Sequence, residues 1–192
     1  MSVYIHPSAV VDEGAQIGAG TRVWHFSHVE GNSVIGENCS IGQNAYIGKK
    51  AVIGNGCKLQ NNVSVYEGVV LADYVFCGPS CVFTNDLTPR AKYPKGHENF
   101  VKTLVGKGVS IGANATIVCG HTLGEWSMIG AGAVITSNVP PHALMLGVPA
   151  KQVGYVCTCG QRLNETLCCS HCHRQFRKTG DGLSEVELDN AE

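Results

Sequence analysis

The sequence predicts an all-β fold, a parallel β-helix, from three observations on one repeating unit. An aliphatic residue recurs every six positions, glycine or asparagine often stands three residues after it, and a small or β-branched residue stands four after it. A six-residue period does not fit an amphipathic α-helix, whose apolar positions recur about every 3.6 residues. Short strands joined by corners remain, and stacking them as parallel coils satisfies the edge of every internal strand.

The aliphatic ladder covers most of the chain and has one interruption. Its first part runs from Ile5 to Phe83 and its second part from Val105 to Ile135, twenty units in all. The small residues that accompany it, such as Ala9, Thr21 and Cys39, suit a cramped interior. We therefore expect one continuous core, in which the loss of a single rung opens a cavity.

Corners are predicted at the third position after each aliphatic residue. Glycine or asparagine fills this position in thirteen of the twenty units, for example Gly14, Asn32 and Asn114. These two residue types tolerate positive φ better than others, so the chain should turn there.

The interruption of the ladder predicts an excursion loop over residues of about 87–104. This stretch carries charges, two prolines and no aliphatic period. A loop this long in a compact repeat protein is usually functional, because ordering it costs conformational entropy. Arg90 and Lys92 are cations suited to an anionic substrate, and His97 is a candidate general base because an imidazole titrates near neutral pH.

Composition limits the partners and the compartment. Lys and Arg number 14 against 15 Asp and Glu, so no broad field attracts nucleic acid or a membrane surface. No apolar stretch approaches the roughly 20 residues of a membrane span, and no secretory segment is apparent. We therefore expect a cytoplasmic protein, in which the ten cysteines are reduced or bind metal.

The chain after Tyr155 is predicted to be a small appendage to the β-helix domain of residues 1–154. The period disappears there, and cysteines follow in a C-x-C and C-x2-C spacing that resembles a shortened zinc ribbon. One interpretation of residues 155–177 is a structural zinc site, with His171 or His173 as substitutes for one thiolate, and the other is a set of free thiols. Residues 178–192 are expected to be disordered. The predicted ligands are Cys157, Cys159, Cys169 and Cys172.

Four segments of the repeats resemble a known family. They are "VWHFSHV" (23–29), "NNVSVYEGV" (61–69), "FCGPSCVFTND" (76–86) and "IGANATIVCG" (111–120). Over residues 3–156 the chain is similar to the hexapeptide-repeat acyltransferases, and in particular to the UDP-2-acetamido-3-amino-2,3-dideoxyglucuronate N-acetyltransferases. The resemblance implies a left-handed helix with 18 residues per coil, hence about seven coils, and a homotrimer with active sites between subunits.

The same resemblance implies an activity. Acetyl would pass from acetyl-CoA to the 3-amino group of the UDP-linked sugar, for surface polysaccharide (O-antigen) synthesis. The alternatives are N-acetylation of a dTDP-linked 3-amino-dideoxyhexose, O-acetylation of a sugar, and a noncatalytic β-helix scaffold. A zinc-dependent carbonic anhydrase on this architecture is disfavoured, because His25 and His28 are the only close histidine pair in the repeats and lack a third partner.

With 18 residues per coil, side chains 18 apart form a column with a spacing of about 4.8 Å. One column consists of Lys49, Glu67 and Asn85. Asn85 is the first candidate for a catalytic residue, because its amide can orient an amine or donate to an oxyanion. Glu67 and the adjacent Asp86 are candidates for holding an ammonium group.

Further residues are predicted to bind the substrates. Aromatic rings near one corner suit stacking on a nucleobase. Small residues on the C-terminal coils would let the pantetheine arm approach closely, and the resemblance assigns Lys151, in "GVPAK", to the CoA phosphates. The nucleotide-sugar set is Trp24, His25, Phe26, Asn61, Asn62, Tyr66, Arg90 and Lys92, and the CoA set is Gly112, Ala113, Gly130, Ala131 and Lys151.

Overall fold

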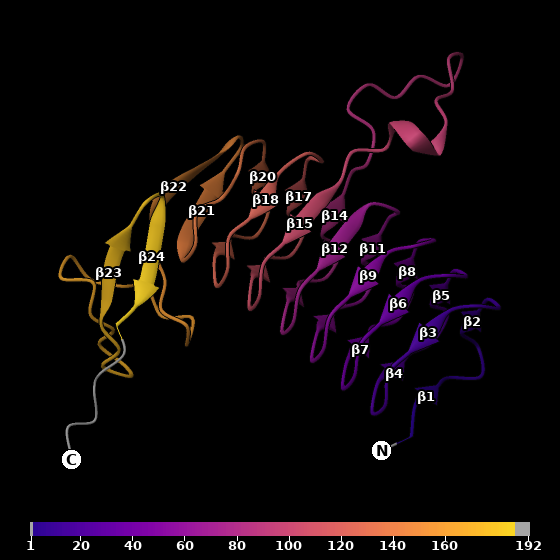
Figure 1. The fold of residues 1–192 in the computed structure, drawn as a ribbon, viewed down its shortest axis with the longest axis horizontal. Coiled ribbons are helices and arrows are strands. Elements are labelled where there is room, and N and C mark those ends of the chain that lie inside the picture. Colours follow the sequence, from indigo (N-terminus) through magenta and orange to yellow (C-terminus); the bar gives the residue numbers. More distant parts are fainter. Residues whose placement is uncertain (1, 187–192) are drawn as a thin grey trace.

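The computed structural model describes residues 2–186, and most of them form a three-faced prism of stacked coils (Figure 1). Each strand of a coil pairs with the corresponding strand of the next coil, and these pairs are parallel. The predicted all-β class and the parallel β-helix are confirmed.

Each face of the prism is one sheet. The first face contains β1 (Tyr4–Ile5), β4 (Arg22–Val23), β7 (Ser40–Ile41), β10 (Lys58–Leu59), β13 (Phe76–Cys77), β16 (Ser110–Ile111), β19 (Met128–Ile129) and β21 (Ala143–Gly147). The second contains β2 (Val10–Val11), β5 (His28–Val29), β8 (Tyr46–Ile47), β11 (Ser64–Val65), β14 (Val82–Phe83), β17 (Thr116–Ile117) and β20 (Val134–Ile135). The third contains β3 (Gln16–Ile17), β6 (Val34–Ile35), β9 (Val52–Ile53), β12 (Val69–Leu71), β15 (Thr103–Val105) and β18 (Thr122–Leu123).

The register between coils repeats along the prism. Tyr4 pairs with Arg22 and Gln16 with Val34, and side chains reach their partners 18 residues away. The coil length implied by the resemblance is therefore correct. The first face has eight parallel strands, one more than the predicted seven coils, because β21 adds a rung beyond the last repeat unit.

The core is the predicted ladder. In the two-residue strands from β4 onward the second side chain is buried, and Ile53, Ile117 and Ile135 are at most 1% exposed. Corners have positive φ at Gly14, at Asn32 and at most of the other predicted positions. Corners with positive φ also occur at residues that disfavour it, namely Phe26, Lys50, Tyr74, Ser80 and Trp126.

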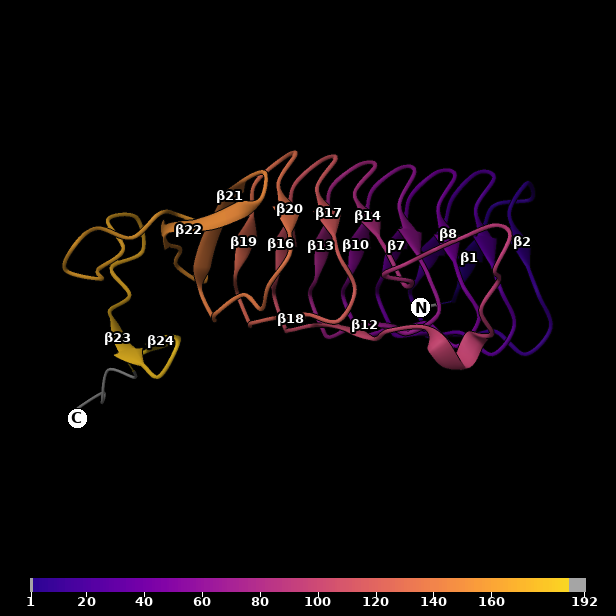
Figure 2. The ribbon, with the colours of Figure 1, turned by 90° about the horizontal axis from the view of Figure 1, so that it is seen from above.

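The excursion loop leaves the coil after β14, which ends at Phe83, and returns at β15, which begins at Thr103. Its predicted bounds were too late at both ends, since Thr103 and Leu104 already pair with β12. The loop contains the helix η1 (His97–Asn99) and runs back along the earlier coils (Figure 2). Its base is closed by the backbone N–H of Val101, which donates to the carbonyl oxygen of Asn85 at 2.8 Å.

The C-terminal part departs from the repeat. β22 (Ala150–Tyr155) runs antiparallel to β21, and β23 (Phe176–Thr179) forms a hairpin with β24 (Gly182–Glu185). The hairpin occupies part of the stretch expected to be disordered, because Phe176 and Leu183 are buried on one side of it. The end of that stretch, residues 187–192, lies outside the described residues. Within residues 2–186, η1 is the one helix and is far too short to cross a bilayer.

Adjacent residues of β9 test the ladder. Ile53 is 1% exposed and Val52 is 37% exposed. Ile53→Ala should lower the free energy of unfolding by about 2–5 kcal/mol, because it removes buried methyl groups and leaves a cavity. Val52→Ala should cost about 0.5 kcal/mol or less. Denaturant unfolding measures both values, and similar losses would contradict the inward ladder.

Candidate functional site

A hollow of about 440 Å³ lies at the corner after the second face, under the excursion loop. We call it the loop-side pocket. Three successive coils and the loop supply its walls, so residues distant in sequence meet there. Its lining residues are Glu30, Tyr46, Lys49, Tyr66, Glu67, Asn85, His97 and Phe100.

The predicted column of Lys49, Glu67 and Asn85 lies in this pocket. These residues form one column because each strand of the second face pairs with the strand one coil further on, as Ser64 does with Val82. The structure thus brings together three of the four predicted catalytic residues, Asn85, Glu67 and His97. Their catalytic roles stay predictions.

The Glu67 carboxylate bonds to two basic side chains at the pocket. It accepts a hydrogen bond from His97 Nδ1 at 2.8 Å and another from Lys50 Nζ at 3.3 Å. Burial raises the pKa of the Glu67 carboxyl, but the hydrogen bonds from His97 and Lys50 outweigh this effect and hold it below its ordinary value. Glu67 is therefore ionised at neutral pH and fixes the loop histidine over the coil.

Asn85 is the last residue of the column and the first of the loop. Its backbone carbonyl closes the loop base, as described above. Among residues 2–186, no hydrogen bond from another residue occupies its side-chain amide. The amide therefore offers both an acceptor and a donor to a bound molecule.

Asp86 does not line the pocket. Its carboxylate accepts a bond from Lys95 Nζ at 2.6 Å and another from the backbone N–H of Thr88 at 2.8 Å, and these two interactions lower its pKa. The ammonium group that it holds belongs to the loop itself.

Sequence reasoning missed Tyr46, Glu30 and Phe100. Burial raises the pKa of Tyr46 to about 12, with a further contribution from the Glu30 carboxylate, so its phenol stays protonated. The column rule could have found Glu30, which lies two coils below Tyr66. No periodic signal could have found Phe100, because it lies in the loop, where its ring contacts His97 edge to face at 5.2 Å.

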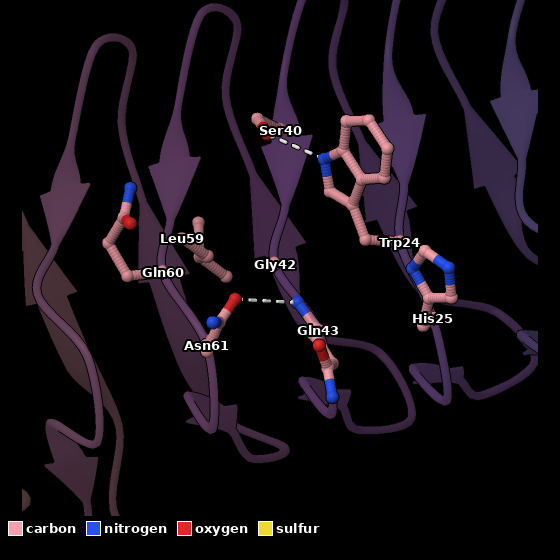
Figure 3. A pocket seen from close by; sticks show the side chains of 8 residues that line it. All are labelled: Trp24, His25, Ser40, Gly42, Gln43, Leu59, Gln60 and Asn61. Atoms are coloured by element: carbon pink, nitrogen blue, oxygen red, sulfur yellow. Dashed lines mark hydrogen bonds between the residues drawn. The ribbon is translucent and has the colours of Figure 1, made fainter.

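A second, smaller hollow of about 260 Å³ lies at the corner after the first face (Figure 3). Trp24, His25 and Asn61 line it, as do Gln43 and Gln60. Trp24 donates from Nε1 to Ser40 Oγ at 3.2 Å, and its ring is parallel to that of His25 at 6.4 Å. The wall is an aromatic surface with amide groups beside it.

The predicted nucleotide-sugar residues thus divide among several places. Trp24, His25 and Asn61 share the second hollow, and Tyr66 lies in the loop-side pocket. The others line neither hollow: Phe26 and Asn62 are exposed corners with positive φ, Arg90 bonds to the carbonyl oxygen of Pro89, and Lys92 lies over the Tyr93 ring.

The predicted CoA residues lie on the last coils. A Cβ on Gly112 would stand 2.4 Å from the backbone N of Ala131, and the N–H groups of Gly112 and Gly130 bond to the next coil. Coil stacking therefore already requires Gly112 and uses the amides of both glycines, whereas a Cβ on Gly130 would meet only the movable end of the Leu146 side chain at close range. Lys151 is exposed on β22 and free of this constraint.

The four predicted metal ligands also come together, at the other end of the molecule. The Sγ atoms of Cys157, Cys159, Cys169 and Cys172 all lie within 4.8 Å of one another. The five cysteines of the repeats are buried in or beside the core.

Comparison with known proteins agrees with this architecture. Residues 14–49 match the family model "Bacterial transferase hexapeptide (six repeats)", and residues 33–67 and 102–137 match "Hexapeptide repeat of succinyl-transferase". The dTDP-3-amino-3,6-dideoxy-alpha-D-galactopyranose 3-N-acetyltransferase of Aneurinibacillus thermoaerophilus is 42% identical over 184 residues, which cover 94% of this chain and 93% of that protein. The chain therefore belongs to the hexapeptide-repeat transferases, as an acetyltransferase.

Two solved structures share the fold. The acetyltransferase domain of PglB from Neisseria gonorrhoeae, in complex with acetyl coenzyme A, has a TM-score of 0.51 and 24% identity, over 79% of this chain and 57% of that one. A UDP-N-acetylglucosamine acyltransferase from Bacteroides fragilis has a TM-score of 0.63 and 18% identity, over 80% and 61%. At these identities the likeness concerns the fold alone, and this chain spans little more than half of either.

The Glu67–His97 bond gives a testable anchor for the loop. Glu67→Gln should speed tryptic cleavage after Arg90 and Lys92 by up to about fivefold at neutral pH, as expected for the weakening of one hydrogen bond to a charged acceptor. The wild-type bond should be complete at neutral pH and should be lost only as the pH falls through the lowered pKa of Glu67.

Glu98→Gln is the matched control. Glu98 lies in η1 next to His97 and bonds to Asn99 but not to Glu67. Cleavage rates that are equal in the two variants would show that Glu67 does not hold the loop.

Proposed function

We propose that this chain transfers the acetyl group of acetyl-CoA to the amino group of a nucleotide-linked amino sugar, and that its substrate is a dTDP-linked 3-amino-dideoxyhexose. Support comes from the Aneurinibacillus relative, which is named for that reaction and matches almost the whole chain. This favours the dTDP-linked alternative over the UDP-linked glucuronate. A role in surface polysaccharide synthesis and a cytoplasmic location stay predictions.

The observation that carries the proposal is the free Asn85 amide beside the Glu67–His97 pair in one pocket. Acetyl transfer needs a neutral amine about 3 Å from the thioester carbonyl and a donor for the developing oxyanion. The Asn85 amide can supply that donor or can accept from the amine. Such a constellation has no purpose in a noncatalytic scaffold.

Proton transfer follows from the histidine geometry. Because Nδ1 of His97 donates to Glu67, Nε2 of the neutral ring is left as an acceptor. In the proposed reaction the sugar amine attacks the thioester carbonyl, a C–N bond forms and the C–S bond breaks. The amine proton passes to His97 Nε2 and then to the departing thiolate of CoA.

The pocket is open on one side, since the His97 side chain is 75% exposed. We therefore place a second copy of the chain against it, within a homotrimer, and the bound CoA along the last coils near Lys151. The second hollow, with Trp24 and His25, would receive the nucleobase by stacking.

An acetyl-CoA assay against a panel of dTDP- and UDP-linked 3-amino sugars tests the proposal. We expect the highest kcat/KM with a dTDP-linked 3-amino-dideoxyhexose. Asn85→Ala should lower kcat about 100-fold or more, as the loss of an oxyanion donor does elsewhere. Asn38→Gly is the control, because Asn38 is a remote corner with a φ of 56° that glycine also adopts.

Three results would count against the proposal or a part of it. No turnover of any panel member would remove the substrate class, and a preference for the UDP-linked glucuronate would remove the choice of nucleotide and sugar. Near-normal kcat in Asn85→Ala would remove Asn85 from the mechanism.

A further inference from the structure

The last part of the chain contains four thiols arranged around a common centre. Sγ–Sγ distances are 3.4 Å for Cys157 with Cys172 and 3.6 Å for Cys159 with both Cys169 and Cys172. Four thiolates that hold Zn²⁺ tetrahedrally, each at about 2.3 Å, lie about 3.8 Å apart. The observed spacing fits that arrangement, and no disulfide joins any of these cysteines.

Two similar turns present the thiols to each other. Gly160 follows Cys159 with a φ of 90°, and His173 follows Cys172 with a φ of 60°. Each turn is closed by a backbone bond, from Gly160 N–H to Cys157 O at 2.8 Å and from His173 N–H to Cys169 O at 2.9 Å. The unusual C-x-C pair therefore reaches the same centre as the C-x2-C pair.

The neighbouring groups are excluded from this centre. Cys168 is directed toward the carbonyl oxygen of Cys169, at 3.9 Å, and is not part of the cluster. His171 and His173 are exposed and contribute no atom to it. An all-sulfur tetrahedral set selects Zn²⁺ among the common hard and borderline cations, with iron as the competing occupant.

The segment around the cluster, residues 155–186, has too small a core to fold by packing alone. Its buried apolar cluster consists of Cys157, Leu163, Cys169, Phe176 and Leu183, so two of the five members are thiols of the cluster. Segments below about 40 residues usually need a metal, a disulfide or a partner for stability. A metal ion at the four thiolates meets this need.

This segment covers the end of the β-helix. The buried His142 ring, at the last coil, packs edge to face on Phe176 at 4.9 Å, and its Nδ1 bonds to Val156 O at 3.0 Å. The N–H of Leu183 donates to Pro141 O at 3.3 Å. We refer to residues 155–186 as the cap, because terminal coils of repeat proteins need such a cover.

We propose that this chain binds one Zn²⁺ through Cys157, Cys159, Cys169 and Cys172, and that the ion keeps the cap folded on the last coil. The proposal is independent of the acetyl-transfer reaction. It goes further than a metal site, because it assigns the ion a structural task at a defined edge of the prism.

Metal analysis of the purified full chain, isolated without chelators, tests the proposal. We expect about one zinc ion per chain in the wild type and in Cys168→Ser, and close to none in the double variant Cys169→Ser/Cys172→Ser. Cys168→Ser is the matched control, since it removes the adjacent thiol outside the cluster.

Limited proteolysis tests whether the ion keeps the cap folded. Zinc removal by a chelator, or the double variant, should expose the bonds after Tyr155 to rapid cleavage, while cleavage within residues 2–154, including the excursion loop, stays as slow as in the zinc-loaded wild type. Zinc-free wild type, an equal amount of iron in its place, or a cap whose resistance is unchanged after complete zinc removal would each overturn the proposal.

Discussion

The backbone register between successive coils is the constraint on which the structure depends. Each strand bonds to the strand one coil further on, so that in the regular coils a side chain stands over the residue 18 positions earlier. Where the excursion loop is inserted, the same pairing joins residues further apart, such as Val82 and Thr116. This register builds the core ladder, and it also builds columns on the outside of the prism. Asn44 donates to Asn62 Oδ1 at 2.9 Å, and Gln43 N–H donates to Asn61 Oδ1 at 3.0 Å, as successive members of two such columns.

Much of the architecture could be predicted because the register between coils appears in the sequence as a six-residue period. The inward residues and most corners follow from it, and so does the row of Lys49, Glu67 and Asn85. Phe26 and Trp126 show where the period stops being informative. Aromatic residues disfavour positive φ, but the stacked coils impose it through bonds such as Trp126 N–H to Lys107 O at 2.8 Å.

The parts without a period were predicted less well for the same reason. The loop has no repeat, so the pairing of Asp86 with Lys95 and the place of Phe100 depend on contacts that only the folded chain defines. The hairpin of β23 and β24 is polar in sequence and becomes ordered through two buried residues, Phe176 and Leu183. Gly112 and Gly130 were assigned to a ligand, yet the close approach of Ala131 already requires Gly112, and the amides of both glycines already bond to the next coil.

Asn85 joins the regular and the irregular parts of the molecule. Its backbone carbonyl closes the base of the loop and its side chain faces the pocket. The proposed catalytic residue therefore lies where the regular coils end and the loop begins.

The most direct measurement of this account is a structure of the enzyme with CoA and its amino-sugar nucleotide bound. The account predicts the sugar amine nitrogen at about 3 Å from the Asn85 amide, beside Glu67 and His97. An amine bound elsewhere, beyond hydrogen-bond reach of all three side chains, would contradict it.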